Sequence, residues 1–512
     1  MITVIMSTDE FEYDVFGLTK AFYPETALNI IRELKQIPEG KLLELDHLKD
    51  IKNGIGTHID HVTSKCDLFF FIYFDMACIH VQVQSEDEVL FYENIPSDRK
   101  EKPKYRNQLK RALYRMYHFM TDKDLLWGTL TGVRPTKIAY EKLEAGLSEE
   151  ETYLSLKEDY YLTGEKADLS VSVAKRELSL LRELDYRNGY SIYIGIPFCP
   201  TTCLYCSFTS YPKEKFEAMI EPYLNALYKE IDYAKTCFPN KKLSTVYIGG
   251  GTPTTLTAEQ LDKLLTVLNE SLDMSQVKEF TVEAGRPDSI TMDKLLVLKK
   301  HGVTRISINP QSMQQKTLDL IGRKHTIEEV AKAFAMAREA GHNNINMDII
   351  IGLPGETYED VSNTLKEITN LNPDSLTVHT LAVKRAARLN IEKDRYDNTE
   401  ESEAERMLSL TCEYAREGNY LPYYLYRQKS AKNLENTGYA RYGKEGYYNI
   451  LIMEEKQSIL ALGAGGLSKF IFHNENRLER VENVKSLKDY IERIDEMILR
   501  KHQFLTENMK DL

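Results

Sequence analysis

Residues 191–208 read SIYIGIPFCPTTCLYCSF, and this stretch determines how the middle of the chain is interpreted. Its first seven residues are mostly apolar, which predicts a buried strand. Three cysteines follow directly, Cys199, Cys203 and Cys206, with the spacing C-x3-C-x2-C. Outside an oxidising compartment such a group indicates metal binding rather than disulfides. We therefore expect a strand that ends in a metal-binding loop.

Predicted strands and helices alternate along the chain after this loop. Short apolar strands are expected at 191–197, 245–251, 279–285, 305–311, 344–354 and 375–383, with helices between them at about 214–236, 258–271, 291–301, 327–340 and 358–369. Strands of this kind indicate a parallel sheet that is buried on both faces. Right-handed crossovers would curl six such units into a partial (β/α)6 barrel of the α/β class, with ligands at the carboxyl ends of the strands.

The flanks of this barrel differ from it in pattern. A chain of 512 residues is too long for one core. Residues 1–185 begin with strands and turns, turn helical after 105, and predict an N-terminal α+β accessory domain. Residues 186–395 form the barrel. Residues 396–512 predict a small C-terminal α+β module with a helix at 401–417, strand-like pieces at 447–453 and 457–466, and a helical tail.

Composition excludes several classes of protein. The formal net charge of −12 argues against broad nucleic-acid binding. No run approaches the 18 apolar residues of a membrane span, and the N-terminus does not resemble a signal peptide, so we expect a cytoplasmic protein without a membrane span. Four further cysteines are scattered and are expected to be small buried apolar residues: Cys66, Cys78, Cys237 and Cys412.

Three thiolates favour a [4Fe–4S] cluster over zinc. Most such clusters have four cysteine ligands, so a set of three leaves one iron open to a small molecule. A structural zinc site normally closes with four ligands, and the first later cysteine is Cys237, at the end of a predicted helix. Zinc stays the alternative.

Polar residues and glycines mark the ends of the following strands. GGGTP at 249–253 lets backbone approach a ligand closely, because glycine has no Cβ. Glu283 and Gln311 end the third and fourth strands, and Arg323 follows. Asp348 lies within the fifth strand, where an inward carboxylate is costly unless it is paired. Either Asp348 contacts a ligand, or a backbone group or a structural arginine pairs with its carboxylate.

The order of these motifs resembles a known family. The cysteine loop is followed by GGGTP, EAGRP (283–287), RISINPQ (305–311) and DIIIGLPGET (348–357), an order similar to the oxygen-independent coproporphyrinogen III oxidases (coproporphyrinogen dehydrogenases) of the radical S-adenosylmethionine (SAM) superfamily. WGTLTGVRPTK at 127–137 resembles the HemZ branch. The resemblance implies a radical SAM barrel, a [4Fe–4S] cluster on the three cysteines, and SAM. The positions that match SAM contacts are Tyr193, Gly250, Gly251, Thr252, Glu283, Gln311, Arg323 and Asp348. The resemblance also implies that Tyr193 is a catalytic residue.

The same resemblance implies an oxidoreductase of porphyrin and heme biosynthesis. The family reaction converts two propionates of coproporphyrinogen III to vinyl groups, giving protoporphyrinogen IX and CO2, through a 5′-deoxyadenosyl radical. A tetrapyrrole substrate and an electron donor such as flavodoxin or ferredoxin follow as expected partners.

The sequence departs from those oxidases at two places. Ser207 and Phe208 follow the cluster motif where the oxidases have a fourth cysteine, and Gly195 stands where they have a histidine. Ser-Phe resembles the heme-chaperone relatives, but their H-N-x-x-Y-W motif is absent, with only Asn433 kept. The alternatives are a heme-binding chaperone of the same fold, or a radical SAM enzyme acting on heme or another tetrapyrrole.

A substrate with four carboxylates needs cations. The candidates are Lys384, Arg385, Arg388, Arg134 and Lys137, since arginine pairs bidentately with carboxylates; each is otherwise a surface charge. Tyr423, Tyr424 and Tyr426 either stack on a tetrapyrrole or pack in the core.

Overall fold

The chain forms two compact units. The computed structural model describes residues 2–24, 26–32, 68–74, 77–85, 89–208, 210–382, 387–391, 400–427 and 434–508. One unit comprises Met1–Val171 and Arg427–Leu434, and the other comprises Ser172–Tyr426 and Glu435–Leu512. In this division the strands of residues 435–482 belong with the barrel. The three-domain division at 185 and 395 stays a prediction.

The first unit is built on a five-stranded sheet with the order β2-β1-β3-β4-β5. Its strands are β1 (Ile2–Met6), β2 (Leu28–Ile31), β3 (Leu68–Phe74), β4 (Cys78–Gln84) and β5 (Val89–Pro96). β3, β4 and β5 pair antiparallel, whereas β1 is parallel to both β2 and β3. The helices are α1 (Glu12–Phe22), α2 (Lys102–Thr121), α3 (Lys137–Glu144), α4 (Glu149–Tyr160) and α5 (Gly164–Arg182), the last crossing the unit boundary.

Helix α1 lies in a stretch that we expected to contain only strands and turns. Val15, Leu18 and Phe22 recur at three- and four-residue intervals and are buried in the core of this unit. The helical spacing of these side chains explains why the expectation was wrong.

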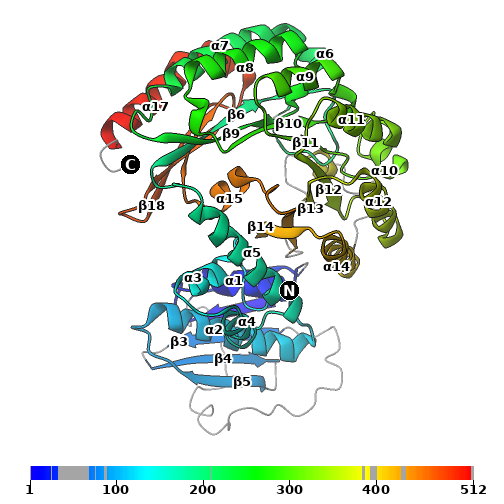
Figure 1. Ribbon diagram of the computed structural model, residues 1–512. Helices are drawn as coiled ribbons and strands as arrows, with labels where there is room; N and C mark the ends of the chain where they lie inside the picture. Colours follow the sequence, from blue (N-terminus) through cyan, green and yellow to red (C-terminus); the bar gives the residue numbers. More distant parts are fainter. Residues whose placement is uncertain are drawn as a thin grey trace. The chain divides into compact units, whose positions relative to one another are not determined.

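The second unit contains the predicted partial (β/α)6 barrel. Six parallel strands are neighbours in chain order: β6 (Gly189–Ile196), β9 (Lys242–Gly250), β10 (Glu279–Gly285), β11 (Arg305–Ile308), β12 (Ile345–Ile351) and β13 (Ser375–Thr380). The connecting helices cover the outer face of the curved sheet (Figure 1): α7 (Ile220–Ala234), α8 (Ala258–Ser271), α9 (Met292–Lys300), α11 (Ile327–Glu339) and α12 (Tyr358–Leu371). The fold class is therefore confirmed.

Further strands extend this sheet beyond both ends of the barrel. β15 (Glu435–Ala440) pairs antiparallel with β13, and β14 (Leu421–Arg427) follows it. At the other end β16 (Ser458–Leu462) pairs parallel with β6, and β17 (Leu467–Phe472) and β18 (Arg477–Glu482) follow. The first and last barrel strands therefore both have a neighbour, which leaves no barrel edge open for pairing with another chain.

Residues 447–453, which we expected as a strand, form helix α15 (Tyr447–Glu454). A short apolar run has no period that separates a buried helix from a buried strand, and three of its apolar side chains are buried. The remaining helices include α6 (Lys213–Phe216), α10 (Gln315–Leu320), α13 (Arg388–Ile391), α14 (Glu401–Glu417), α16 (Leu487–Glu492) and α17 (Ile494–Asn508). Across the described ranges, no helix has the length and apolar character needed to span a membrane.

A buried ion pair joins helices α7 and α17. Lys501 Nζ lies 2.6 Å from Glu230 Oε1, and both side chains are fully buried. The other carboxylate oxygen accepts a hydrogen bond from the backbone N–H of Gly463, at 2.8 Å. Because Gly463 follows β16, the pair also fixes the loop beside the end of β6.

Candidate cofactor site at the carboxyl ends of the barrel strands

The three cysteines lie in the loop that leaves β6. Cys203 is buried, and Cys199 and Cys206 are partly exposed. The loop is held to the segment after α10, because the backbone N–H of Leu204 donates to the carbonyl of Ile321 at 2.9 Å. The hydroxyl of Thr201 donates to the carbonyl of Gly322 at 3.1 Å. One segment that is distant in the sequence, residues 321–322, thus fixes the loop at two points.

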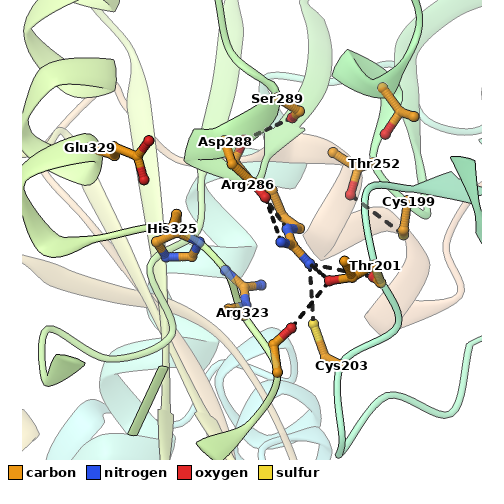
Figure 2. A network of polar contacts seen from close by, with 12 residues as sticks. Cys199, Thr201, Cys203, Thr252, Arg286, Asp288, Ser289, Arg323, His325 and Glu329 are labelled. Carbon is orange, nitrogen blue, oxygen red and sulfur yellow. Dashed lines mark hydrogen bonds and ion pairs between the residues drawn. The ribbon is translucent and has the colours of Figure 1, made fainter. Parts of the chain in front are cut away.

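The glycine-rich turn after β9 packs directly on the cysteine loop. The backbone N–H groups of Gly251 and Thr252 donate to the carbonyls of Ile196 and Phe198, at 2.8 and 2.7 Å. The hydroxyl of Thr252 lies 3.5 Å from the sulfur of Cys199 (Figure 2). A Cβ on Gly251 would stand 2.7 Å from the Phe198 carbonyl oxygen, so close approach of the two chains requires glycine there.

Two tyrosine rings and one carboxylate come from β6, β9 and β10, and a third tyrosine ring comes from α15. The ring of Tyr247 is stacked on that of Tyr448, with centroids 4.5 Å apart, and Tyr193 stacks on both at 6.2 and 6.3 Å. The Tyr247 hydroxyl donates to Glu283 at 2.6 Å. Burial raises the pKa of Glu283 to about 7, although the Tyr247 hydrogen bond opposes this shift.

Gln311 and Asp348 meet across neighbouring strands. The backbone N–H of Gln311 donates to the carbonyl of Asp348 at 2.9 Å, and Gln311 has a positive φ of 68°. Its side-chain Oε1 is buried and has no hydrogen-bond partner among the described residues. Asp348 accepts from Asn346 Nδ2 at 2.6 Å and lies 3.8 Å from His379 Nε2. Burial alone would raise the pKa of Asp348, but His379 and Asn346 hold it below its ordinary value.

Arg323 lies beside the cysteine loop and is buried. Its guanidinium donates to the carbonyl of Asn309 and to the hydroxyl of Tyr205, the latter at 3.3 Å. Within the described part of the chain, Arg323 Nε is buried without a partner. The phenol of Tyr205 and the thiol of Cys203 raise the pKa of Arg323 above its ordinary value, although burial alone would lower it.

These residues fit a cluster and a polar organic cofactor. Three thiols in one loop are the soft ligands that iron–sulfur clusters take. Buried polar atoms nearly always have partners, and a ligand bound here would supply them for Gln311 Oε1 and Arg323 Nε, which have none among the described residues. Burial raises the pKa of the Cys199 thiol to about 11, so bound metal is needed to hold it as a thiolate. No three His, Cys, Asp or Glu side chains in the described ranges are gathered to hold a single ion.

The candidate substrate cations that the structure describes lie in different units. Lys384 and Arg385 lie outside the described residues. Arg134 and Lys137 belong to the first unit, where Lys137 pairs with Glu141 at 3.5 Å. Arg388 begins α13. Tyr423 and Tyr424 are buried against one another with centroids 4.9 Å apart, and Tyr426 is partly buried, which agrees with core packing for the first two.

Sequence reasoning missed several side chains at this site. Arg286 contacts Thr201 of the cysteine loop, and His379 faces Asp348. His379 could have been found by the reasoning used for Asp348, because a polar side chain on a core strand needs a partner. Tyr247 and Tyr448 carry no such signal, since tyrosines are common in buried strands and helices.

The two departures from the oxidase pattern line one pocket. Its volume is about 240 Å3, and it is lined by Tyr193, Gly195, Ile196, Pro197, Ser207, Phe208, Gly250, Ala464, Gly465 and Lys485. Gly195 and Phe208 are therefore neighbours of the same space, and Lys485 is the cation that lines it. The pocket adjoins the predicted SAM contacts Tyr193 and Gly250.

A parallel partial barrel with three cysteines after its first strand defines the class of this protein. The family model of the radical SAM superfamily matches residues 193–368. HemZ of Bacillus subtilis, an oxygen-independent coproporphyrinogen-III oxidase-like protein, is 43% identical over 387 residues, which cover 74% of this chain and 77% of HemZ. The chain therefore belongs to the HemZ-like branch of the oxygen-independent coproporphyrinogen III oxidase family within the radical SAM superfamily.

Other relatives in this family differ in their roles. The heme chaperone HemW of Bacillus subtilis is 34% identical over 312 residues, covering 60% of this chain and 76% of HemW. The oxygen-independent coproporphyrinogen III oxidase of Salmonella typhimurium is 33% identical over 192 residues, covering 38% of this chain and 42% of that protein. Membership of this family implies SAM and a [4Fe–4S] cluster. The family includes both oxidases and heme chaperones, so membership does not decide between these two roles.

Proposed function

We propose that this chain is a coproporphyrinogen III oxidase that works without oxygen. It would bind a [4Fe–4S] cluster through Cys199, Cys203 and Cys206 and convert coproporphyrinogen III to protoporphyrinogen IX with release of CO2. When bound, the cluster and SAM would supply 5′-deoxyadenosyl radical chemistry, in which SAM is split to methionine and 5′-deoxyadenosine and one hydrogen is removed from each propionate. Each propionate would then lose CO2 and pass one electron to an external acceptor. Partly exposed cluster cysteines need a reducing compartment, so we infer a cytoplasmic location and a donor such as flavodoxin or ferredoxin.

The buried polar atoms without partners carry this proposal. Gln311 Oε1 accepts and Arg323 Nε donates, so together they suit a ligand with both kinds of group, such as SAM. Asp348 is ionised, since its pKa is held low, and suits the hydroxyls of a ribose or an ammonium group. Gly250, Gly251 and Thr252 complete the expected SAM contacts.

The aromatic side chains have a different task in this proposal. Tyr193, Tyr247 and Tyr448 form a stacked wall beside Glu283. Such a wall excludes water from a reactive site and restricts the position of the reacting carbon. Tyr193 also lines the pocket of about 240 Å3, so it is the proposed contact between the SAM site and the substrate.

Anaerobic turnover tests the proposal directly. Reconstituted protein, SAM, a strong reductant and coproporphyrinogen III are incubated together, and CO2 and the mass of the tetrapyrrole are followed. We expect loss of two carboxyl groups, and no loss with Cys203→Ala. Formation of 5′-deoxyadenosine with an unchanged tetrapyrrole mass would leave the cofactors in place and refute the substrate.

A second candidate is a heme-binding chaperone. Gly195, Ser207 and Phe208 line one pocket, and the Ser-Phe pair resembles the chaperone branch. Gly195 stands where the oxidases have a histidine, so this pocket lacks that imidazole. Titration with heme separates the candidates: tight 1:1 binding, without decarboxylation in the turnover assay, would favour the chaperone.

A further inference from the structure

We propose that Arg286 is a positioning residue for the iron–sulfur cluster, which holds the cysteine loop and raises the reduction potential of the cluster through Cys203. The inference rests on the cluster that the family and the site imply. It does not depend on which tetrapyrrole is the substrate.

Arg286 connects the end of β10 to the cysteine loop. It is 3% exposed and follows β10 directly, before the turn at Pro287–Ser289. Figure 2 shows its side chain between Asp288 on one side and the cysteine loop on the other. Its Nε and Nη2 donate to the two carboxylate oxygens of Asp288, at 3.0 and 2.6 Å.

The third nitrogen of Arg286 faces the loop. Nη1 donates to the hydroxyl of Thr201 at 2.6 Å and lies 3.4 Å from the Thr201 carbonyl oxygen. It is also 3.9 Å from the sulfur of Cys203. Since Thr201 in turn donates to Gly322, a continuous chain of hydrogen bonds runs from Asp288 through the loop to the segment after α10.

This arrangement is specific to arginine. A buried guanidinium is costly unless its charge and its donors are matched, and the fork of arginine serves Asp288 and Thr201 at the same time. Each of its three nitrogens has a protein partner, so Arg286 differs from Arg323, which keeps Nε for a ligand. Arg286 therefore holds the loop at Thr201 and Cys203, whereas Arg323 contacts the loop at Tyr205 and stays a proposed SAM contact through Nε.

A cation at a cluster sulfur has a predictable effect. Cys203 carries negative charge as a cluster ligand, and one further electron makes the cluster more negative. An N–H donor and a positive charge next to that sulfur stabilise the reduced form more than the oxidised form, which raises the potential. Asp288 neutralises part of the charge of Arg286, but its carboxylate lies on the far side of the guanidinium from Cys203 (Figure 2).

The test is a redox titration of the reconstituted full-length protein monitored by electron paramagnetic resonance. Arg286→Gln removes the charge, and Arg286→Lys keeps the charge but loses the fork. At a fixed potential near the midpoint we expect the ratio of reduced to oxidised cluster to fall about tenfold in Arg286→Gln, a shift of ~59 mV to more negative potential. Arg286→Lys should shift less.

Arg338→Gln is the matched control. Arg338 also forms an ion pair with an aspartate of the second unit, Asp374, at 2.7 Å, but it lies on α11 away from the cysteine loop. Its loss should change neither the iron and sulfide content nor the potential.

Each outcome decides the inference. A wild-type potential in Arg286→Gln, at full iron and sulfide content, overturns it. If Arg286→Gln retains the wild-type circular dichroism but loads little iron, the loop-holding role stands, and the potential of Arg286→Lys decides the electrostatic role. A shifted potential in protein that does not turn over coproporphyrinogen III leaves the inference standing and refutes the proposed substrate alone. A wild-type protein that takes up no cluster refutes both.

Discussion

Gly195 and Gly251 stand at the ends of neighbouring strands, but only one of them has to be glycine. A Cβ at Gly251 would meet two backbone carbonyl oxygens, of Phe198 at 2.7 Å and of Ile196 at 2.8 Å. A Cβ at Gly195 would find its nearest atoms at 3.6 Å, an ordinary contact distance. The first glycine is therefore required by packing, whereas the second leaves space at the pocket.

Gly251→Ala should destabilise the second unit and the cluster loop. The added methyl group cannot displace backbone without separating β9 from the loop, a strain of about 1–3 kcal/mol in the free energy of unfolding. Urea unfolding and iron content measure the effect. Gly195→Ala is the control and should change the free energy of unfolding by less than about 0.5 kcal/mol with full iron content. Equal effects of the two substitutions would contradict the packing argument.

Glu356 gives stability that depends on pH. Burial raises the pKa of Glu356 from an ordinary value near 4.5 to about 7, even though Ser312 donates a hydrogen bond to it. Between these two values the unfolded chain has lost the proton that the folded chain still holds. The free energy of unfolding therefore falls as the pH rises from about 4.5 to about 7, and this contribution is constant above that range.

Glu356→Gln should remove this loss of stability at high pH. The amide cannot ionise, so the variant should be as stable as the wild type at pH 4 and more stable at pH 8, by about 3 kcal/mol if the whole pKa shift is expressed. Urea unfolding of both proteins at the two pH values measures the difference. If the two proteins differed in free energy of unfolding by the same amount at both pH values, ionisation of Glu356 would not be the cause of the difference.

The sequence identifies the ionisable residues of the site better than their partners. The three cysteines were predicted from their spacing, Glu283 from its place at the end of a strand, and Asp348 from the cost of an inward carboxylate. Their partners come from other elements: Tyr247 from β9, His379 from β13 and Arg286 from the turn after β10. Which of them meet depends on sheet register, which the sequence alone does not determine.

Among the elements, those with a clear period could be predicted. Helix α8 and helix α14 have the bounds that the apolar spacing predicts, 258–271 and 401–417. The prediction of a strand where helix α15 lies was wrong, because that apolar run is too short to have a period. The strands β16–β18 and β15 lie far from the barrel in sequence, so their addition to its two edges could not be read from local pattern.

Two ion pairs join the same helices and should differ in strength. Lys501 and Glu230 are fully buried, whereas Lys229 and Asp495 are exposed, with 3.5 Å between their charged atoms. Lys501→Met leaves a carboxylate buried without its cation and should lower the free energy of unfolding by about 3–5 kcal/mol. Lys229→Met should lower it by about 1 kcal/mol at most, because water screens that pair.

Urea unfolding of the two variants, with the slope on denaturant compared as well, tests this contrast. The loop at Gly463 should also lose protection from hydrogen exchange in Lys501→Met, since Glu230 accepts from its N–H. Equal and small losses of stability would mean that the hydrogen bonds of Glu230 alone hold α17 in place.

At the scale of the whole molecule, the candidate cofactor site belongs to one unit. The cysteine loop, the turn after β9 and the segment around Arg323 all lie within Ser172–Tyr426, and hydrogen bonds connect them to one another. The sheet of the first unit has its own core of side chains from β1, β3, β4, α1 and α2. Binding of a cluster should therefore stabilise one unit and leave the other unchanged.

Hydrogen exchange measured by mass spectrometry on apo and reconstituted protein tests this division. A ligand that binds only the folded state lowers the population of open states of the segments that hold it. We expect slower exchange after reconstitution at 198–206, 249–253 and 321–323, and unchanged exchange at β1, β3 and β4. Cys203→Ala taken through the same reconstitution is the control and should show no protection. Protection that extended equally to β1 would mean that the two units respond to the cluster together, and it would give the first unit a part in cofactor binding.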